Sequence, residues 1–184
     1  ATSLAEMKKT QLVIGAFSKN HPTFQWPALL NNLVGTKFKI IVGYRGGATN
    51  HKAMEQGETN GWAPSWGNLN GTKPEYLRDK KVSIVTQFGL ERIAELPEVP
   101  ILRELVPASE RDIVDFLTAA TPVSRALALP PGVPADRVAA LRTAFAKTMK
   151  DPGFLADIKE RNLPLRPRNG AEVKKYVDLI VNAS

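Results

Sequence analysis

The sequence predicts an α/β fold in which a largely parallel β-sheet is flanked by helices. The first observation behind this prediction is a pair of short apolar segments, residues 11–17 and 38–42, each leading into a glycine-containing turn and then a helical segment. Strands that alternate with helices in this way are typical of parallel βαβ units. The second observation is that 184 residues, 43% of them hydrophobic and 23% charged, are enough for one domain with a core or two small lobes.

Local apolar patterns predict the N-terminal elements. Residues 11–17 are apolar on both faces, which indicates a buried strand. Residues 24–33 carry a leucine stripe and are followed by Gly35, so we expect a helix that ends at this glycine. The β-branched residues at 38–42 predict a second strand, and residues 48–56 a second helix.

The middle of the chain is less regular. We expect a short strand at residues 60–62, a loop with a short helix over residues 66–79, and another strand at residues 82–88. Residues 96–100 contain two prolines, which lack the N–H group that a helix interior or a central strand needs. Neither element is therefore expected there.

Helices dominate the predicted C-terminal part. Ser109 is expected to cap a helix over residues 112–120. Its inward face is expected to hold Ile113, Phe116 and Leu117.

A strand at residues 125–129 should follow, and then three more helices. Each helix has a residue that favours a helix start: Pro134, Asp151, and Asn169 paired with Glu172 in a capping box. The first of these helices places Leu141, Phe145 and Met149 on one face.

The composition excludes several classes of site. The chain has no cysteine, which removes thiolate chemistry, cysteine-bound zinc and iron–sulfur clusters, and its two histidines form no metal-binding motif. We expect neither a metal nor a cofactor. The net charge is +7, but lysine and arginine are scattered, so we favour a solvated basic surface over nucleic-acid binding. No apolar run approaches the roughly 18 residues that span a bilayer.

Catalytic motifs are also absent from the sequence. Ser18 and His21 are close together, but a nucleophile also needs an oriented base and an oxyanion hole, and no nucleophile-elbow or phosphate-loop motif occurs. We therefore expect no enzymatic activity. Glu55 and Glu58, on either side of Gly57, are expected to form a solvated helix end.

The two glycine-containing turns remain as candidates for function. In a parallel sheet both turns lie at the carboxyl ends of strands, where ligand crevices form. Free N–H groups at a helix start, with the helix dipole, hold a carboxylate there. Tyr44 can wall a pocket and offer its hydroxyl, and Arg45 can add a charge-assisted bond. Alternatively, Gly46 and Gly47 only permit a tight turn and Arg45 is solvated. The candidate ligand-binding residues are Gly15, Ala16, Phe17, Ser18, Asn20, His21, Tyr44, Arg45, Gly46 and Thr49.

Eight short segments match those of a known family in order and spacing over nearly the whole chain. They are PALLN (27–31), GTKFK (35–39), VGYRG (42–46), AMEQGE (53–58), PEYLR (74–78), QFGLER (87–92), LPEVP (96–100) and PPGVPADRVAAL (130–141). With these motifs the chain resembles the solute receptors of tripartite tricarboxylate transporters, the extracytoplasmic binding proteins of the Bug family.

The resemblance implies a fold like that of type II periplasmic binding proteins, in which two α/β lobes close on a small carboxylate. Residues 1–124 would be the second lobe, and residues 125–184 the return strand and C-terminal helices that complete the first lobe. The first lobe itself is expected to be missing, so we expect a fragment, cut or processed before Ala1. Asn20 and His21 stand where the family often has glycine and serine, which makes the approach to the first turn bulkier.

The function that the resemblance implies is reversible capture of a small carboxylate and its delivery to membrane permease subunits, with the receptor in the periplasm. No signal peptide is present in this chain. We expect weak or undetectable solute binding by the chain alone, and self-association through an apolar face left by the missing lobe. The alternative is the effector-sensing domain of a transcription regulator, which shares the two-lobed architecture, although no DNA-binding helix-turn-helix is visible.

Overall fold

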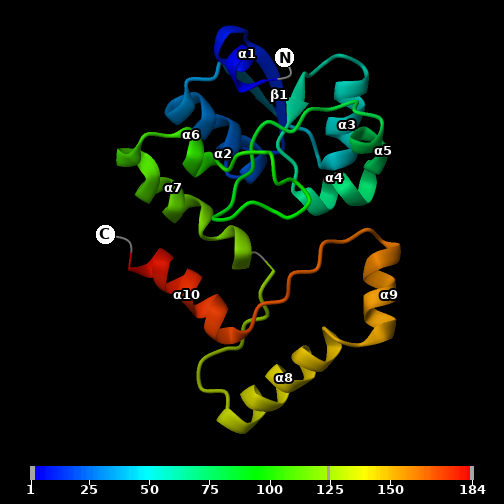
Figure 1. Cartoon of the computed structure of the whole chain (residues 1–184), viewed down its shortest axis with the longest axis vertical. Coiled ribbons are helices and arrows are strands. Elements are labelled where there is room, and N and C mark those ends of the chain that lie inside the picture. Colours follow the sequence, from blue (N-terminus) through cyan, green and yellow to red (C-terminus); the bar gives the residue numbers. More distant parts are fainter. Residues whose placement is uncertain (1–2, 124, 183–184) are drawn as a thin grey trace. The chain divides into compact units, whose positions relative to one another are not determined.

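The computed structural model describes residues 3–123 and 125–182 (Figure 1). The chain forms two compact units, Ala1–Arg111 and Asp112–Ser184, and each is described here by itself. The boundary expected between residues 124 and 125 concerns the lobes of a longer receptor and stays a prediction.

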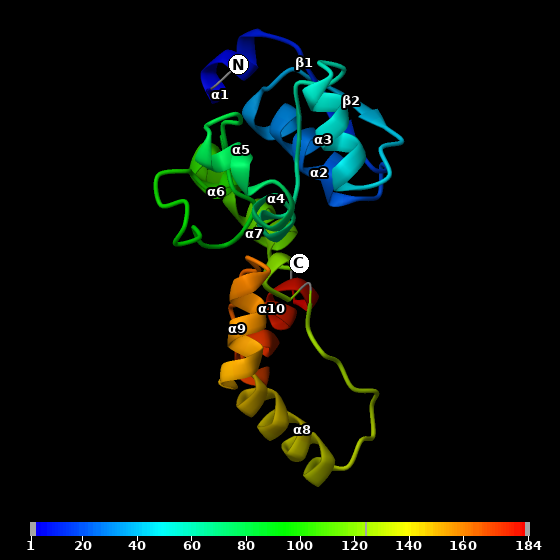
Figure 2. The ribbon, with the colours of Figure 1, turned by 90° about the vertical axis from the view of Figure 1, so that its right-hand side faces the viewer.

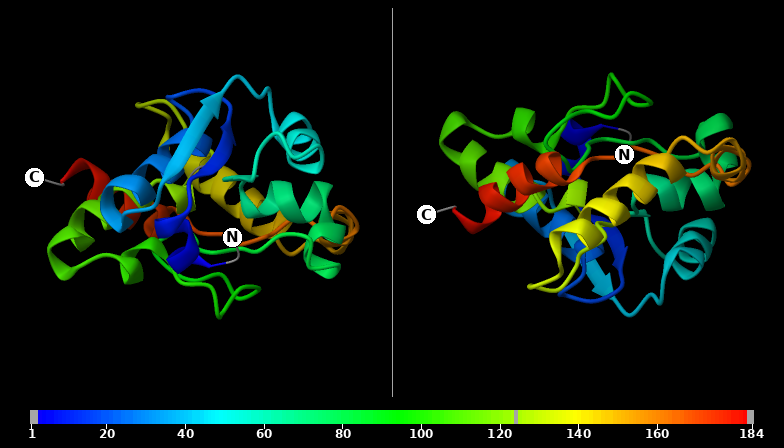
Figure 3. Two further views of the ribbon diagram at one scale, coloured as in Figure 1. Left: turned by 90° about the horizontal axis from the view of Figure 1, so that it is seen from above. Right: turned by 90° about the horizontal axis from the view of Figure 1, so that it is seen from below.

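The first unit is built on a three-stranded parallel sheet, as predicted. Its strands are β1 (Leu12–Ala16), β2 (Phe38–Val42) and β3 (Gly61–Trp62), in the spatial order β2-β1-β3. All pairs are parallel, and Ile14 of β1 lies opposite Ile40 of β2. The left view of Figure 3 shows β1 and β2 as two blue ribbons side by side. The α/β prediction is confirmed, and β1 occupies the centre of the sheet.

Two helical segments connect these strands. α2 (Pro22–Leu29) continues into a π-helical turn, η1 (Leu30–Val34), and ends at Gly35, whose φ of 80° is left-handed. α3 (Gly47–Glu55) packs against β1 and β3. The expected helices are confirmed, and each starts one or two residues before its predicted first residue because glycine or proline is well tolerated in the first turn.

Short elements fill the N-terminal edge and the middle of the first unit. α1 (Leu4–Lys9), which the sequence did not predict, contributes Met7 to a core cluster with Leu12 and Ile14. The expected irregular segment contains α4 (Trp66–Thr72) and α5 (Pro74–Arg78). α6 (Leu102–Leu105) follows later in the chain.

The strand expected at residues 82–88 is not formed. Only Gln87 makes a β-bridge, to Ile101, and the rest of the segment is irregular. The Gln87 side chain instead fastens the loop after it, donating to the carbonyls of Leu96 and Val99 (2.8 Å each) and accepting the N–H of Ile93 (3.0 Å). Residues 82–88 have the composition of a strand but no neighbouring strand to pair with. Residues 96–100 are irregular, as expected.

Ser109 does not cap the next helix. It lies inside a 3₁₀ turn, η2 (Ala108–Glu110), which leads directly into α7 (Arg111–Thr118). The inward face of α7 was also predicted wrongly, because Val114 and Thr118 are buried while Ile113 and Phe116 are 50% and 40% exposed. The helix is therefore rotated relative to the expected apolar stripe.

In the second unit, buried side chains are found in and just after α7, whereas the later helices are exposed. η3 (Thr121–Val123) precedes α8 (Ala135–Thr148), α9 (Pro152–Glu160) and α10 (Gly170–Val181), and none of the last three helices contains a buried residue. The capping box of Asn169 and Glu172 at the start of α10 is confirmed.

The strand expected at residues 125–129 is also absent. Figure 2 shows the stretch before α8 as an extended segment, and Leu127 is 85% exposed. An apolar segment with no partner strand cannot form a ladder, which is the physical reason for the error. Across the described parts of both units, every helix is too short or too polar to cross a membrane.

Candidate functional site

The first candidate turn continues directly from the central strand. Gly15 and Ala16 are buried at the end of β1, whereas Phe17 is 47% exposed. Farther along, Ser18 is half-buried, and Asn20 and His21 are exposed. The turn thus passes from the core to the surface within three residues.

His21 closes the start of α2. Its Nδ1 accepts the N–H of Thr23 (3.2 Å), and its backbone carbonyl accepts the N–H groups of Phe24 (2.9 Å) and Gln25 (3.1 Å). Pro22, the first helical residue, has no N–H group. The first N–H groups of α2, those of residues 23–25, are therefore already bonded within the protein, and the start of this helix offers none of them to a ligand.

The same region is tied back to the strand by Thr23. Its hydroxyl accepts the N–H of Phe17 (3.0 Å) and lies 2.9 Å from Nδ1 of His21. Because Thr23 is only 6% exposed, this small network fixes the turn on its buried side.

The second candidate turn is bonded to the first. The N–H groups of Gly43 and Tyr44 both donate to the carbonyl of Ala16 (3.1 and 3.2 Å), and Gly43 also reaches the carbonyl of Phe17 (3.2 Å). The two turns that the sequence indicated separately thus form one continuous surface at the carboxyl ends of β1 and β2. Arg45 is exposed on this surface.

The start of α3 differs from that of α2, because no side chain caps it. Its N-cap residue is Gly46, with a φ of 110°, and the Gly46 carbonyl accepts from the Thr49 hydroxyl (3.0 Å) and the Asn50 amide (2.9 Å). The N–H groups of the first three helical residues, 47–49, have no acceptor within a helix. Thr49 uses its hydroxyl to close the helix start, so the backbone N–H groups of residues 47–49, rather than this hydroxyl, are left for a ligand.

A buried asparagine supports this helix start from below. Asn50 is 1% exposed, and its Oδ1 has no hydrogen-bond partner. A Cβ built on Gly15 would lie 2.3 Å from this oxygen and 3.2 Å from the ring of Tyr44. Because Gly15 has no side chain, Asn50 and the Tyr44 ring both pack directly against its backbone, and we call this residue the Gly15 floor. No local pattern in the sequence indicates that this oxygen is buried.

Asn68 also places a buried amide oxygen against a glycine, in this case Gly47 at the start of α3. Its Oδ1 is also buried without a partner, and it would lie 2.7 Å from a Cβ on Gly47, the first residue of α3. Two unpartnered amide oxygens thus flank the uncapped start of α3. Buried polar atoms are normally paired, so this concentration marks an unusual place in the fold.

Tyr44 does not present a free hydroxyl. Its Oη donates to Oε1 of Glu58 at 2.6 Å, and this hydrogen bond to a carboxylate raises the pKa of Tyr44. Glu55 and Glu58 are exposed at the end of α3, as expected, and the Glu58 carboxylate in addition holds a residue of the candidate turn. The sequence separation of fourteen residues left no local signal for the contact.

Glu55 is held in a similar way by a different tyrosine. The Tyr76 hydroxyl and the Lys73 ammonium donate to Oε1 of Glu55 at 2.6 and 2.9 Å. Burial, followed by the hydrogen bond to Glu55, raises the pKa of Tyr76 to about 12. The lysine and tyrosine hydrogen bonds lower the pKa of Glu55.

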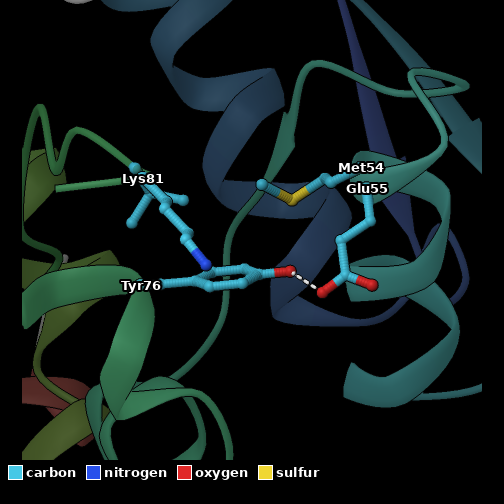
Figure 4. Close-up of a pocket in the computed structure, with 5 residues that line it drawn as sticks. Met54, Glu55, Tyr76 and Lys81 are labelled. Carbon is cyan, nitrogen blue, oxygen red and sulfur yellow. Dashed lines mark hydrogen bonds between the residues drawn. The ribbon is translucent and has the colours of Figure 1, made fainter. Parts of the chain in front are cut away.

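A cavity of about 220 Å³ opens beside this second pair. Met54, Glu55, Tyr76, Lys81 and Val82 line it, and Figure 4 shows the Tyr76 ring between Lys81 and the Glu55 carboxylate. None of these residues belongs to either turn. The cavity therefore lies apart from the residues that the sequence identified, and its two charged groups already have partners within the protein.

His51, next to Asn50 on α3, is buried between aromatic rings. It is 2% exposed and packs edge-on against Trp62 and Tyr76, with ring centroids 5.1 and 5.4 Å away. Its Nε2 has no partner. Burial, and to a lesser extent the nearby Lys73 charge, lowers the pKa of His51. The neutral ring is therefore a packing element of α3. In the described residues, no group of three or more acidic or histidine side chains could hold a metal ion.

Comparisons with known proteins identify the fold. No family model matches the sequence, and no curated protein does either. Among solved structures, the chain is similar to a TctC solute-binding protein from Polaromonas, crystallised without ligand, with a TM-score of 0.64 and 16% sequence identity. The similarity covers 97% of this chain but 59% of that chain.

This similarity confirms, at the level of the fold, the resemblance that the sequence motifs indicated. The chain spans about three fifths of the length of the solute-binding protein that it matches. Over nearly its whole length, the chain has the fold of part of a TctC solute-binding protein.

Proposed function

We propose that this chain is part of an extracytoplasmic solute receptor that holds a small carboxylate reversibly, without making or breaking covalent bonds. The observation that carries the proposal is the uncapped start of α3, which lies beside Arg45 and above the Gly15 floor. The fold of a TctC solute-binding protein supports it. No cofactor enters this mechanism.

The physical basis is the charge distribution at a helix start. Free N–H groups and the aligned peptide dipoles together act like roughly half a positive charge. The guanidinium of Arg45 can add a charge-assisted bond to the same carboxylate. Since the first N–H groups of α2 are already bonded, residues 15–21 would contribute shape and contacts from the turn itself, and residues 44–49 the attraction of a helix start.

Capture by this chain alone should be weak. A two-lobed receptor closes only as far as the solute binds the closed form better than the open one. The chain spans 59% of the matching solute-binding protein, so contacts from the remainder would be needed for tight binding. In the complete receptor we propose a periplasmic location and delivery of the solute to membrane permease subunits. No observation favours the effector-sensing domain of a regulator.

Residue-resolved NMR can test the proposal despite weak binding. The full chain would be titrated with acetate, succinate and citrate up to tens of millimolar, with sodium chloride as the control for ionic strength. We expect saturable shifts of the backbone N–H signals of residues 46–49 with a millimolar dissociation constant, and little change in the α2 signals of residues 23–25. Absence of saturable shifts at residues 46–49 with all three carboxylates would contradict the proposed site. Micromolar affinity would contradict the expectation of a half-enclosed solute.

A substitution separates the helix start from general charge effects. Arg45→Gln should weaken binding by roughly 3- to 10-fold, because it removes one charge-assisted hydrogen bond. Lys19→Gln, an exposed charge on the first turn, is the matched control and should change the affinity less than Arg45→Gln.

A further inference from the structure

The backbone of the turn between β2 and α3 is closed by a hydrogen bond from the N–H of Gly46 to the carbonyl of Tyr44 (2.9 Å). Gly43 and Gly46, which flank Tyr44 and Arg45, have φ values of 115° and 110°, in a region that glycine enters without strain. Two hydrogen bonds from Gly43 and one from Tyr44 anchor the start of the turn to the first turn. A side-chain anchor would hold more firmly the direction in which Arg45 and the start of α3 face.

The Tyr44 side chain supplies that anchor. Its ring lies against the Gly15 floor, and its hydroxyl donates to Glu58 at 2.6 Å. Because the hydroxyl is already used, Tyr44 cannot offer it to a solute without giving up Glu58.

Glu58 in turn has a fixed backbone. Its N–H and that of Thr59 both donate to the carbonyl of Ala53 (2.8 and 3.3 Å), which ends α3. The next residue, Asn60, exchanges hydrogen bonds with Val13 of β1 at 2.7 and 2.8 Å. The Glu58 carboxylate thus projects from a segment tied both to α3 and to the central strand.

We propose that Glu58 is a positioning residue for the second candidate turn, residues 44–47, and acts through the hydroxyl of Tyr44. The inference rests on the proposed function, since it concerns the geometry that residues 44–47 present to a carboxylate. Glu58 does not touch the solute in this account. It holds the Tyr44 ring on Gly15 and thereby sets the orientation of Arg45 and of the uncapped α3 start.

Three variants of the full chain distinguish the hydrogen bond from the charge. Glu58→Ala removes the acceptor and the charge, Tyr44→Phe removes the donor only, and Glu58→Gln keeps an acceptor but removes the charge. Glu55→Ala is the control, because it breaks the other tyrosine–glutamate hydrogen bond, also 2.6 Å long and away from the turn, together with the ion pair of Glu55 to Lys73.

Without solute, Glu58→Ala and Tyr44→Phe should shift the backbone N–H signals of residues 43–47 in the same direction, while Glu58→Gln and Glu55→Ala leave them near their original positions. With succinate as the probe, Glu58→Ala and Tyr44→Phe should each weaken binding roughly 2- to 10-fold, and combining them should add little. Glu58→Gln should stay within about twofold of the original affinity.

Two results would overturn the proposal. One is a Glu58→Ala variant whose solute-free signals for residues 43–47 match those of the unmodified chain. The other is a Glu58→Gln variant that binds succinate much more tightly or as weakly as Glu58→Ala, since the charge rather than the hydrogen bond would then matter. If the unmodified chain shows no succinate-dependent shifts, the proposed function fails, and the solute-free comparison alone decides the positioning role.

Discussion

Replacing Gly15 by alanine is the sharpest test of the floor beneath the candidate turns. A Cβ at this position would lie 2.3 Å from Oδ1 of Asn50, about 1 Å closer than ordinary van der Waals contact. Asn50 cannot swing away freely, because it is 1% exposed and its amide holds the carbonyl of Gly46. Either the strand or the start of α3 must therefore move.

The expected cost follows from these contacts. Overpacking in a filled core costs about 1–3 kcal/mol, and losing the hydrogen bond from Asn50 to Gly46 adds about 1 kcal/mol. A small gain from restricting the unfolded chain offsets part of this. We expect Gly15→Ala to lower the free energy of unfolding by about 2–3 kcal/mol.

Urea denaturation followed by tryptophan fluorescence is the suitable assay. All three tryptophans, at positions 26, 62 and 66, belong to the first unit, so the signal reports on the unit that contains Gly15. With a typical denaturant slope, the midpoint should fall by roughly 1 M. Gly61→Ala is the matched control, because its Cβ would meet only Cδ1 of Ile14 at 3.4 Å, and it should change stability by less than about 0.5 kcal/mol.

A double-mutant cycle would identify the cause of the loss. Asn50→Ala removes the oxygen that the new methyl group meets, so the Gly15→Ala and Asn50→Ala pair should be more stable than the sum of the two single effects by about 1–2 kcal/mol. The reasoning is refuted if Gly15→Ala costs no more than Gly61→Ala, or if the two substitutions are simply additive.

Three further outcomes are expected. His21→Ala should destabilise the first unit by about 0.5–2 kcal/mol in urea titrations because α2 loses its cap, whereas His21→Asn should recover most of it; equal losses would argue against a capping role. Because burial lowers the pKa of His51 below its ordinary 6.5, the unfolded chain binds a proton more readily, so stability should be complete above about pH 6.5 and fall below it. Lys73, Glu55 and Glu75 are the charges near this ring, and His51→Phe should flatten the decline; an unchanged pH profile would count against it. In sedimentation velocity, association should increase with concentration and weaken in Leu141→Lys, whereas a monomer at high concentration would contradict it.

Sequence reasoning located the elements whose signals are local. The strand at residues 38–42 and the capping box at Asn169 depend on neighbouring residues only, and both are present. The strands expected at residues 82–88 and 125–129 have equally apolar compositions but are not formed. A strand requires a partner, and the partner cannot be read from the segment itself.

The candidate site shows the same division. Glycine placement was sufficient to indicate both turns, because a glycine between strand and helix has a local conformational meaning. The contact of Gly15 with Asn50 and the bond from Tyr44 to Glu58 join residues 35 and 14 positions apart, so only the folded chain brings them together. His21 carried an ambiguous signal, since histidine is not among the favoured capping residues.

Because α8, α9 and α10 contain no buried residue, we expect these helices to open locally more often than the sheet does. Isolated helices of nine to fourteen residues are marginal in water, because only tertiary contacts normally hold them. Amide protons in these helices should exchange with deuterium far sooner than those of β1, and a protease should first nick the extended stretch before α8.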